Sequence, residues 1–102
     1  MTLEAVQSVE IVCFDRTLRV RLEREGQPWY QTVNYTLTGI EWHHNPGAFW
    51  FDMHNHKRSA NWFASVLLEL ENEIDVRLQL TSATTWTNVP DEVKREIEFA
   101  AG

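Results

Sequence analysis

The sequence contains one cysteine and four glycines, and the scarcity of each excludes a class of protein. The single Cys13 cannot form an internal disulfide, so we expect a reducing, cytoplasmic setting. The four glycines are scattered and form no phosphate-cradling motif. No apolar run approaches the roughly 20 residues of a membrane span, and residues 1–4 do not begin a secretory signal. We therefore expect no nucleotide cofactor and no membrane partner.

Basic residues are also few, with 9 Lys and Arg against 15 Asp and Glu and a net charge of −6. Binding to a phosphate backbone needs clustered cations, so direct nucleic-acid binding is not expected. The acidic residues are dispersed rather than gathered in a block, which is typical of a solvated exterior. An acidic inhibitor of a nucleic-acid-binding protein is left open as an alternative function.

The length of 102 residues predicts a single domain over 1–102, without repeats or linkers. Hydrophobic residues make up 43% of the chain and charged residues 24%, as in ordinary globular proteins. This composition excludes a disordered or low-complexity chain. In size, acidity and lack of motifs the chain is similar to the orphan proteins carried on mobile gene cassettes and phages.

Alternation of apolar and polar residues predicts strands in the first half of the chain, over 9–14, 18–22 and 29–37. Asn45–Gly47 is the strongest turn signal and predicts a hairpin between 40–44 and 48–53. A register symmetric about this turn places Trp42 near Trp50 across the ladder.

The segment 59–73 fits both a strand and a helix, and its apolar spacing favours a helix ending near residue 72. Strict alternation predicts a strand over 74–80, and Pro90 followed by two acids predicts a helix to residue 100. The resulting order is β-β-β-β-α-β-α. It predicts an α+β fold, with a predominantly antiparallel sheet of about five strands and helices packed on one side.

Aromatic residues are abundant, with five Trp, five Phe and two Tyr. Helices on one side would leave the other sheet face bare, and exposed apolar patches usually mark binding sites. We therefore predict a non-enzymatic binding protein that recognises a small molecule or a protein through an aromatic surface or pocket. The candidate ligand or interface residues are Trp42, Trp50, Tyr30, Asp52 and His54.

The same bare face suggests self-association. Large rings on both faces of the hairpin cannot all be buried against one helical layer, and two-fold dimers are the commonest assembly. The sequence thus predicts a homodimer, with Trp42 or Trp50 at or near the contact.

Asp52, His54 and His56 are spaced so that an extended strand places all three on one face. A carboxylate and two imidazoles form a weak metal-ligand set, and no further histidine follows to complete it. A small enzyme or metal-binding protein that uses these residues is the alternative function. The sequence offers no stronger catalytic set, because Cys13 lies in a predicted strand beside Val9 and Ile11 and should be buried and unreactive.

Overall fold

In a computed structural model, the backbone is described for residues 2–33, 39–44, 47–53 and 59–101, and side chains for the same residues except 59–63 and 66. Trp62 and Phe63 of the predicted helix therefore have no described side chains. The elements, in chain order, are β1 (Thr2–Val12), β2 (Thr17–Leu22), η1 (Pro28–Thr32), β3 (Ile40–His43), β4 (Ala48–Asp52), α2 (Ser59–Ile74), β5 (Val76–Gln79), β6 (Thr85–Thr87) and α3 (Asp91–Ala101).

One curled sheet runs through the molecule in the order β3-β4-β2-β1-β5, with β6 also paired to β1. The pairs β1–β2, β2–β4 and β3–β4 are antiparallel, whereas β5 and β6 each pair with β1 in parallel. The predicted α+β class with a mostly antiparallel sheet is confirmed. The short strand β6, with exposed Thr85 and Thr87, was not predicted because three residues are too few for an alternation signal.

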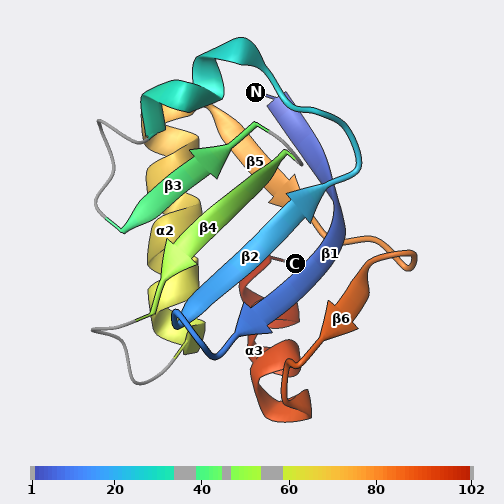
Figure 1. The fold of residues 1–102 in the computed structure, drawn as a ribbon. Helices are drawn as coiled ribbons and strands as arrows, with labels where there is room; N and C mark the ends of the chain where they lie inside the picture. Colours follow the sequence, from blue (N-terminus) through green and yellow to red (C-terminus); the bar gives the residue numbers. More distant parts are fainter. Residues whose placement is uncertain (1, 34–38, 45–46, 54–58, 102) are drawn as a thin grey trace.

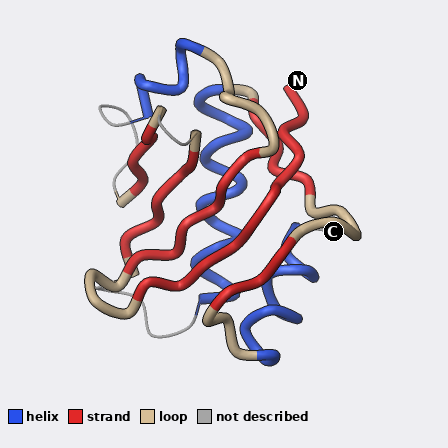
Figure 2. Tube along the Cα trace, turned by 45° about the vertical axis from the view of Figure 1, so that its right-hand side comes forward, coloured by secondary structure: helices blue, strands red, loops and turns tan. Residues whose placement is uncertain are grey.

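The two described α-helices, α2 and α3, lie on the far face of the sheet in Figure 1, and Figure 2 shows the same layering from a turned view. α2 crosses behind β4 and β3, and α3 packs against α2. The core lies between these layers. Its largest fully buried side chains are Tyr30, Phe49, Phe51, Leu18, Leu22, Ile40, Leu70 and Ile97. Within the described chain, no helix covers the near face, which we call the open face.

The predicted strand over 29–37 is wrong where the structure describes it, because Pro28–Thr32 forms a 3-10 helix. Pro28 stands at its start, where a fixed φ and a missing N–H favour helical turns over strand pairing. Tyr30 is buried from this short helix and not from a strand. Residues 34–37 of the prediction lie outside the described residues.

The helix prediction over 59–73 is confirmed, and the helix continues to Ile74. The predicted C-terminal helix is confirmed as well. The strand predicted over 74–80 is observed as β5, which begins two residues later because Asp75 adopts a positive φ of 56° between helix and strand.

The hairpin of β3 and β4 forms, but in a register one residue away from the symmetric one. His43 pairs with Ala48, so the connection spans residues 44–47 and is closed by a 2.9 Å hydrogen bond from the Gly47 amide to the His43 carbonyl. A one-residue slip moves every side chain of one strand to the other face.

Trp42 and Trp50 are consequently not neighbours across the ladder. Trp42 pairs with Phe49 on the core face, and Trp50 pairs with Glu41 on the open face. The prediction that the two tryptophans share a face is wrong for this reason.

A bulge at Gln7 resets the alternation of β1, since its pairing with β2 jumps between Val6 and Ser8. Before the bulge, Glu4 and Val6 point into the core, and after it Val9 is the next fully buried residue. The extra residue therefore places Ser8 on the open face, and Glu10 follows it there.

Candidate binding site on the open sheet face

A row of side chains crosses the open face from one edge of the sheet to the other. The strand register aligns Glu41 with Trp50, Trp50 with Arg19, Arg19 with Glu10, and Glu10 with Thr87. Side chains directly opposite on neighbouring strands lie within contact distance. The row therefore forms one continuous polar stripe centred on a single large ring.

The indole of Trp50 is held between two cationic or ionisable groups. The imidazole of His43 stacks on it with centroids 3.7 Å apart, and the guanidinium carbon of Arg19 lies 3.6 Å from its centroid. Since β3 and β2 flank β4 on opposite sides, these groups cover opposite faces of the ring. Only the edge of Trp50 remains for a ligand, so a base or aromatic ligand cannot stack on it.

Arg19 is oriented by a second contact, with the carboxylate of Asp15. Its guanidinium forms a 2.7 Å ion pair with Asp15, and the Thr17 hydroxyl donates a 2.6 Å hydrogen bond to the same carboxylate. The hydrogen bond from Thr17, with the hydrogen bond and charge of Arg19, outweighs desolvation and lowers the pKa of Asp15. The carboxylate therefore stays ionised at neutral pH and keeps Arg19 over the ring.

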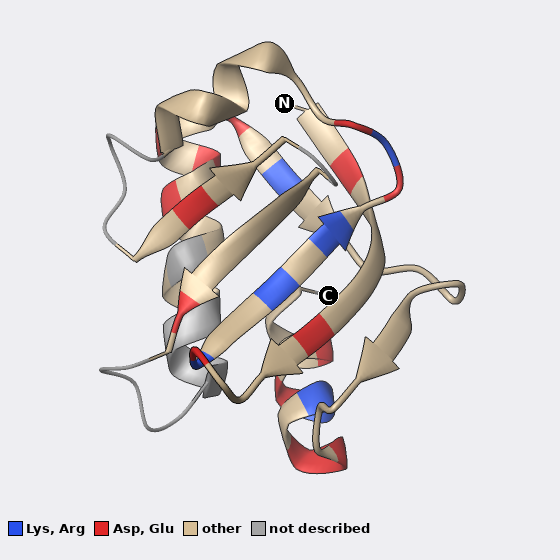
Figure 3. Ribbon diagram, in the orientation of Figure 1, with Lys and Arg blue, Asp and Glu red and all other residues tan. Residues whose placement is uncertain are grey.

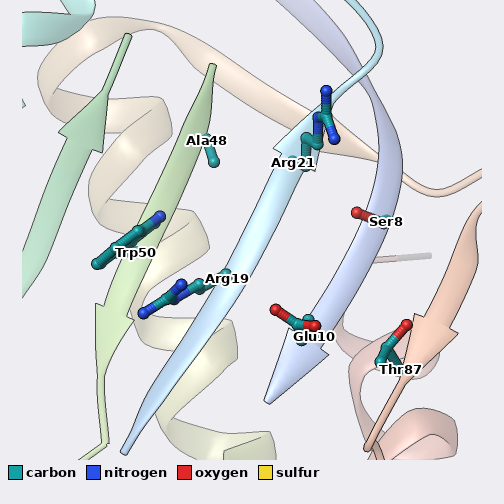
Figure 4. Close-up of a pocket in the computed structure, with 7 residues that line it drawn as sticks. All are labelled: Ser8, Glu10, Arg19, Arg21, Ala48, Trp50 and Thr87. Carbon is teal, nitrogen blue, oxygen red and sulfur yellow. The ribbon is translucent and has the colours of Figure 1, made fainter. Parts of the chain in front are cut away.

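On the same face, a hollow of about 260 Å³ opens beside Trp50 (Figure 4). Its floor contains the two small side chains Ser8 and Ala48, which leave space between their larger neighbours. Trp50, Arg19, Arg21, Glu10 and Thr87 surround this floor.

The charged side chains around the hollow differ in whether they have an ion-pair partner. Figure 3 shows the two cations of β2 beside the acidic band of β1. Arg19 is paired with Asp15, but among the described residues neither Arg21 nor Glu10 has an ion-pair partner within 4.0 Å. The hollow thus presents one guanidinium and one carboxylate that can still engage a ligand.

The structure describes four of the five sequence-predicted ligand or interface residues and places them on two different faces of the sheet. Trp50 and Asp52 lie on β4 and face the open side with Arg19 and Thr17, their partners in β2. Tyr30 and Trp42 instead pack edge to face in the core, 0% and 4% exposed, with centroids 5.1 Å apart. These two rings are therefore not part of the open face.

His54, the fifth of these residues, and His56 lie outside the described residues, so their arrangement with Asp52 is untested. Within the part of the chain that is described, no three His, Cys, Asp or Glu side chains gather in a way that could hold a metal ion. Asp52 itself is exposed at the end of β4.

Sequence reasoning missed the polar residues of the hollow. Arg19 and Arg21 were visible as the charged half of an alternating strand, but alternation does not reveal which strands lie beside it. Ser8 and Glu10 reach this face only because of the bulge at Gln7.

No protein-family model matches the chain, and no curated protein matches it in sequence. The chain is similar to a solved integron cassette protein, Hfx_Cass5, from the mobile metagenome of the North West Arm Sewage Outfall. The two are 23% identical over 99% of this chain and 97% of that one, with a TM-score of 0.43. At this level the likeness carries no functional argument.

Among the described helices, none is both long enough and apolar enough to cross a membrane.

Proposed function

We propose that the chain is a non-enzymatic binding protein that holds a small polar molecule with an anionic group in the hollow beside Trp50. The observation that carries this proposal is Arg21, which has no ion-pair partner among the described residues and lies at a hollow whose floor is made of small side chains. A guanidinium binds carboxylate and phosphate groups through two parallel hydrogen bonds.

The other groups of the hollow suit a ligand that also carries hydroxyl or amine groups. Ser8 and Thr87 supply hydroxyls, and Glu10 supplies an acceptor for a donor on the ligand. Because both faces of Trp50 are covered, selectivity comes from hydrogen bonds and charge, not from stacking. A volume of about 260 Å³ suits a molecule smaller than a nucleotide.

The test is an amide NMR titration with three small probes of graded charge: O-phospho-L-serine, L-serine and ethanolamine. We expect the phosphorylated compound to shift the resonances of Ser8, Arg21, Ala48 and the Trp50 indole, and to bind most tightly of the three. Arg21→Gln should weaken that binding about tenfold, the loss of a charge-assisted hydrogen bond. Arg95→Gln on α3 removes the same charge far from the hollow and is the matched control. Tightest binding by ethanolamine, or shifts only outside the hollow, would contradict the proposal.

We propose the homodimer as a second property of the open face. Trp42 does not contribute to such a contact, since it is buried in the chain's own core. What supports it now is that Trp50 and the stripe around it lie on a face that no described helix covers. Sedimentation equilibrium at micromolar concentration decides it: a species of monomer mass contradicts the dimer.

The alternative of a metal-dependent or acid–base enzyme at Asp52, His54 and His56 is tested by metal analysis of the purified protein with His54→Ala as control. Stoichiometric metal that this substitution removes would favour the alternative over the binding proposal. That the gene travels on mobile cassettes or phages remains a proposal as well.

A further inference from the structure

A buried pair of ionisable side chains, Glu4 and Tyr30, lies at the opposite end of β1 from the hollow beside Trp50. The hydroxyl of Tyr30 donates a 2.6 Å hydrogen bond to Oε1 of Glu4, and the two side chains are 0% and 5% exposed. Glu4 is buried because it precedes the bulge of β1 and so points to the core face. A carboxylate is acceptor-only when ionised and is rarely buried without partners.

Tyr30 satisfies one of the two carboxylate oxygens. Burial, the hydrogen bond to Glu4 and the negative charge of Glu4 raise the pKa of Tyr30 well above its ordinary value, so the hydroxyl keeps its proton and donates. Among the described residues, no hydrogen bond or ion pair reaches the second oxygen of Glu4.

Glu4 also lines a second hollow, of about 320 Å³. The polar residues of this hollow are Thr2, Glu4, Glu23, Arg24, Gln27 and Gln79. Two carboxylates against one guanidinium give it a net charge of −1, and Arg24 is not within ion-pair distance of Glu4. The hydroxyl of Thr2 and the amide oxygens of Gln27 and Gln79 add neutral acceptors.

We propose that this second hollow binds a small organic ammonium ion, with Glu4 as the charged acceptor. A primary ammonium has three N–H donors and no acceptor, which matches a hollow lined by a carboxylate and by side chains with amide and hydroxyl oxygens. In a partly dehydrated site the attraction between the ammonium and Glu4 is much stronger than between exposed ions.

A purely structural role for Glu4 would need only the bond to Tyr30. Glu4→Gln separates the two roles, because its amide oxygen can still accept from Tyr30 while the negative charge is lost. Glu92→Gln removes the same charge from an exposed residue of α3, outside this hollow, and is the matched control.

The probes are propylammonium chloride and its uncharged counterpart 1-propanol, at constant ionic strength. Binding is followed by the amide resonances of Glu4, Ala5 and Gln27, and folding by the urea midpoint of each variant. We expect saturable shifts with propylammonium, none with propanol, at least a tenfold weaker affinity in Glu4→Gln, and less than a threefold change in Glu92→Gln. No saturable shift in the natural chain, equal binding of propanol, or unchanged affinity in a folded Glu4→Gln would overturn the proposal. These readouts lie apart from the hollow beside Trp50, so their failure leaves the proposed function standing.

Discussion

Trp42 and Trp50 belong to the same hairpin and lie on opposite faces of the sheet. Trp42 pairs with Phe49, with ring centroids 4.8 Å apart, and is 4% exposed. Trp50 pairs with Glu41 and is held by Arg19 on the open side. Two residues of one type, eight positions apart, therefore have different physical roles, one in the core and one at the surface.

The first prediction compares Trp42→Ala with Trp50→Ala. Trp42→Ala leaves a cavity among packed rings and should lower the free energy of unfolding by about 3–5 kcal/mol. Trp50→Ala removes a partly exposed ring and its contact with Arg19, which is worth about 0.5–2 kcal/mol. Urea denaturation followed by far-UV circular dichroism measures both changes. Equal losses in the two variants would contradict the placement of the rings on different faces.

The second prediction concerns stability at alkaline pH. The folded chain raises the pKa of Tyr30 above the value of about 10 found in an unfolded chain. Below about pH 10, Tyr30 is protonated in both the folded and the unfolded chain, so its full contribution to the free energy of unfolding is present. Above it the unfolded chain loses the proton while the folded chain holds it, so stability falls by about 1.4 kcal/mol per pH unit from this group. Unfolding free energies between pH 8 and 12 should show this slope.

Tyr30→Phe is the control for the alkaline slope. It removes the hydrogen bond to Glu4, which should cost about 1–3 kcal/mol at neutral pH because a buried carboxylate oxygen loses its donor. It should also flatten the slope above pH 10, since the other tyrosine is present in both proteins. An unchanged slope would show that Tyr30 is not the group responsible.

Most of the strands and helices could be predicted from the sequence because their apolar residues recur with the period of a strand or of a helix. The buried residues of β2 illustrate this: Leu18, Val20 and Leu22 are all at most 2% exposed, as their spacing indicated. The register of the β3–β4 hairpin could not be predicted in this way. Both faces of this hairpin carry large apolar residues, so the hydrophobic pattern does not distinguish two registers one residue apart.

The candidate site was predictable only in part. Trp50 and Asp52 could be placed on one face by the alternation along β4. Arg19, Arg21 and Glu10 reach the same face only through the order of the strands and the bulge in β1. Strand order is set by contacts between segments far apart in the chain, and a local pattern does not contain that information. Tyr30 was misplaced because Pro28 starts a 3-10 helix in a segment whose composition favours a strand.

The third prediction reverses the expectation for Cys13. β1 ends at Val12, and Cys13 is exposed in the turn before β2. This turn, which contains the hydrogen bond from Thr17 to Asp15 and the positive φ of Arg16, begins two residues earlier than the alternation suggested. Phe14 beside it is 99% exposed, so this ring does not pack over the thiol.

A thiol reagent such as 5,5′-dithiobis(2-nitrobenzoic acid) should therefore label the native protein at a rate within a few-fold of the urea-denatured chain. The absorbance of the released thiolate measures both rates. Labelling that is slowed a hundredfold or more in the native protein would restore the buried assignment. Cys13→Ser should be labelled in neither state and is the control for the reaction.

The last prediction tests how closely the loop before η1 packs on the ring cluster. Gly26 has a φ of +83°, and a Cβ atom there would lie 2.6 Å from Cη2 of Trp42 and 2.9 Å from Cδ2 of Tyr30. Gly39 has nearly the same φ, +81°, but among the described residues its Cβ would meet only the Cβ of Asp52 at 4.0 Å. Gly39→Ala should thus cost only the backbone strain, about 1 kcal/mol. Gly26→Ala adds displacement of two packed rings, which should cost about 1–3 kcal/mol more. Urea midpoints of the two variants measure the difference directly, and equal losses would mean that the loop does not press on the rings.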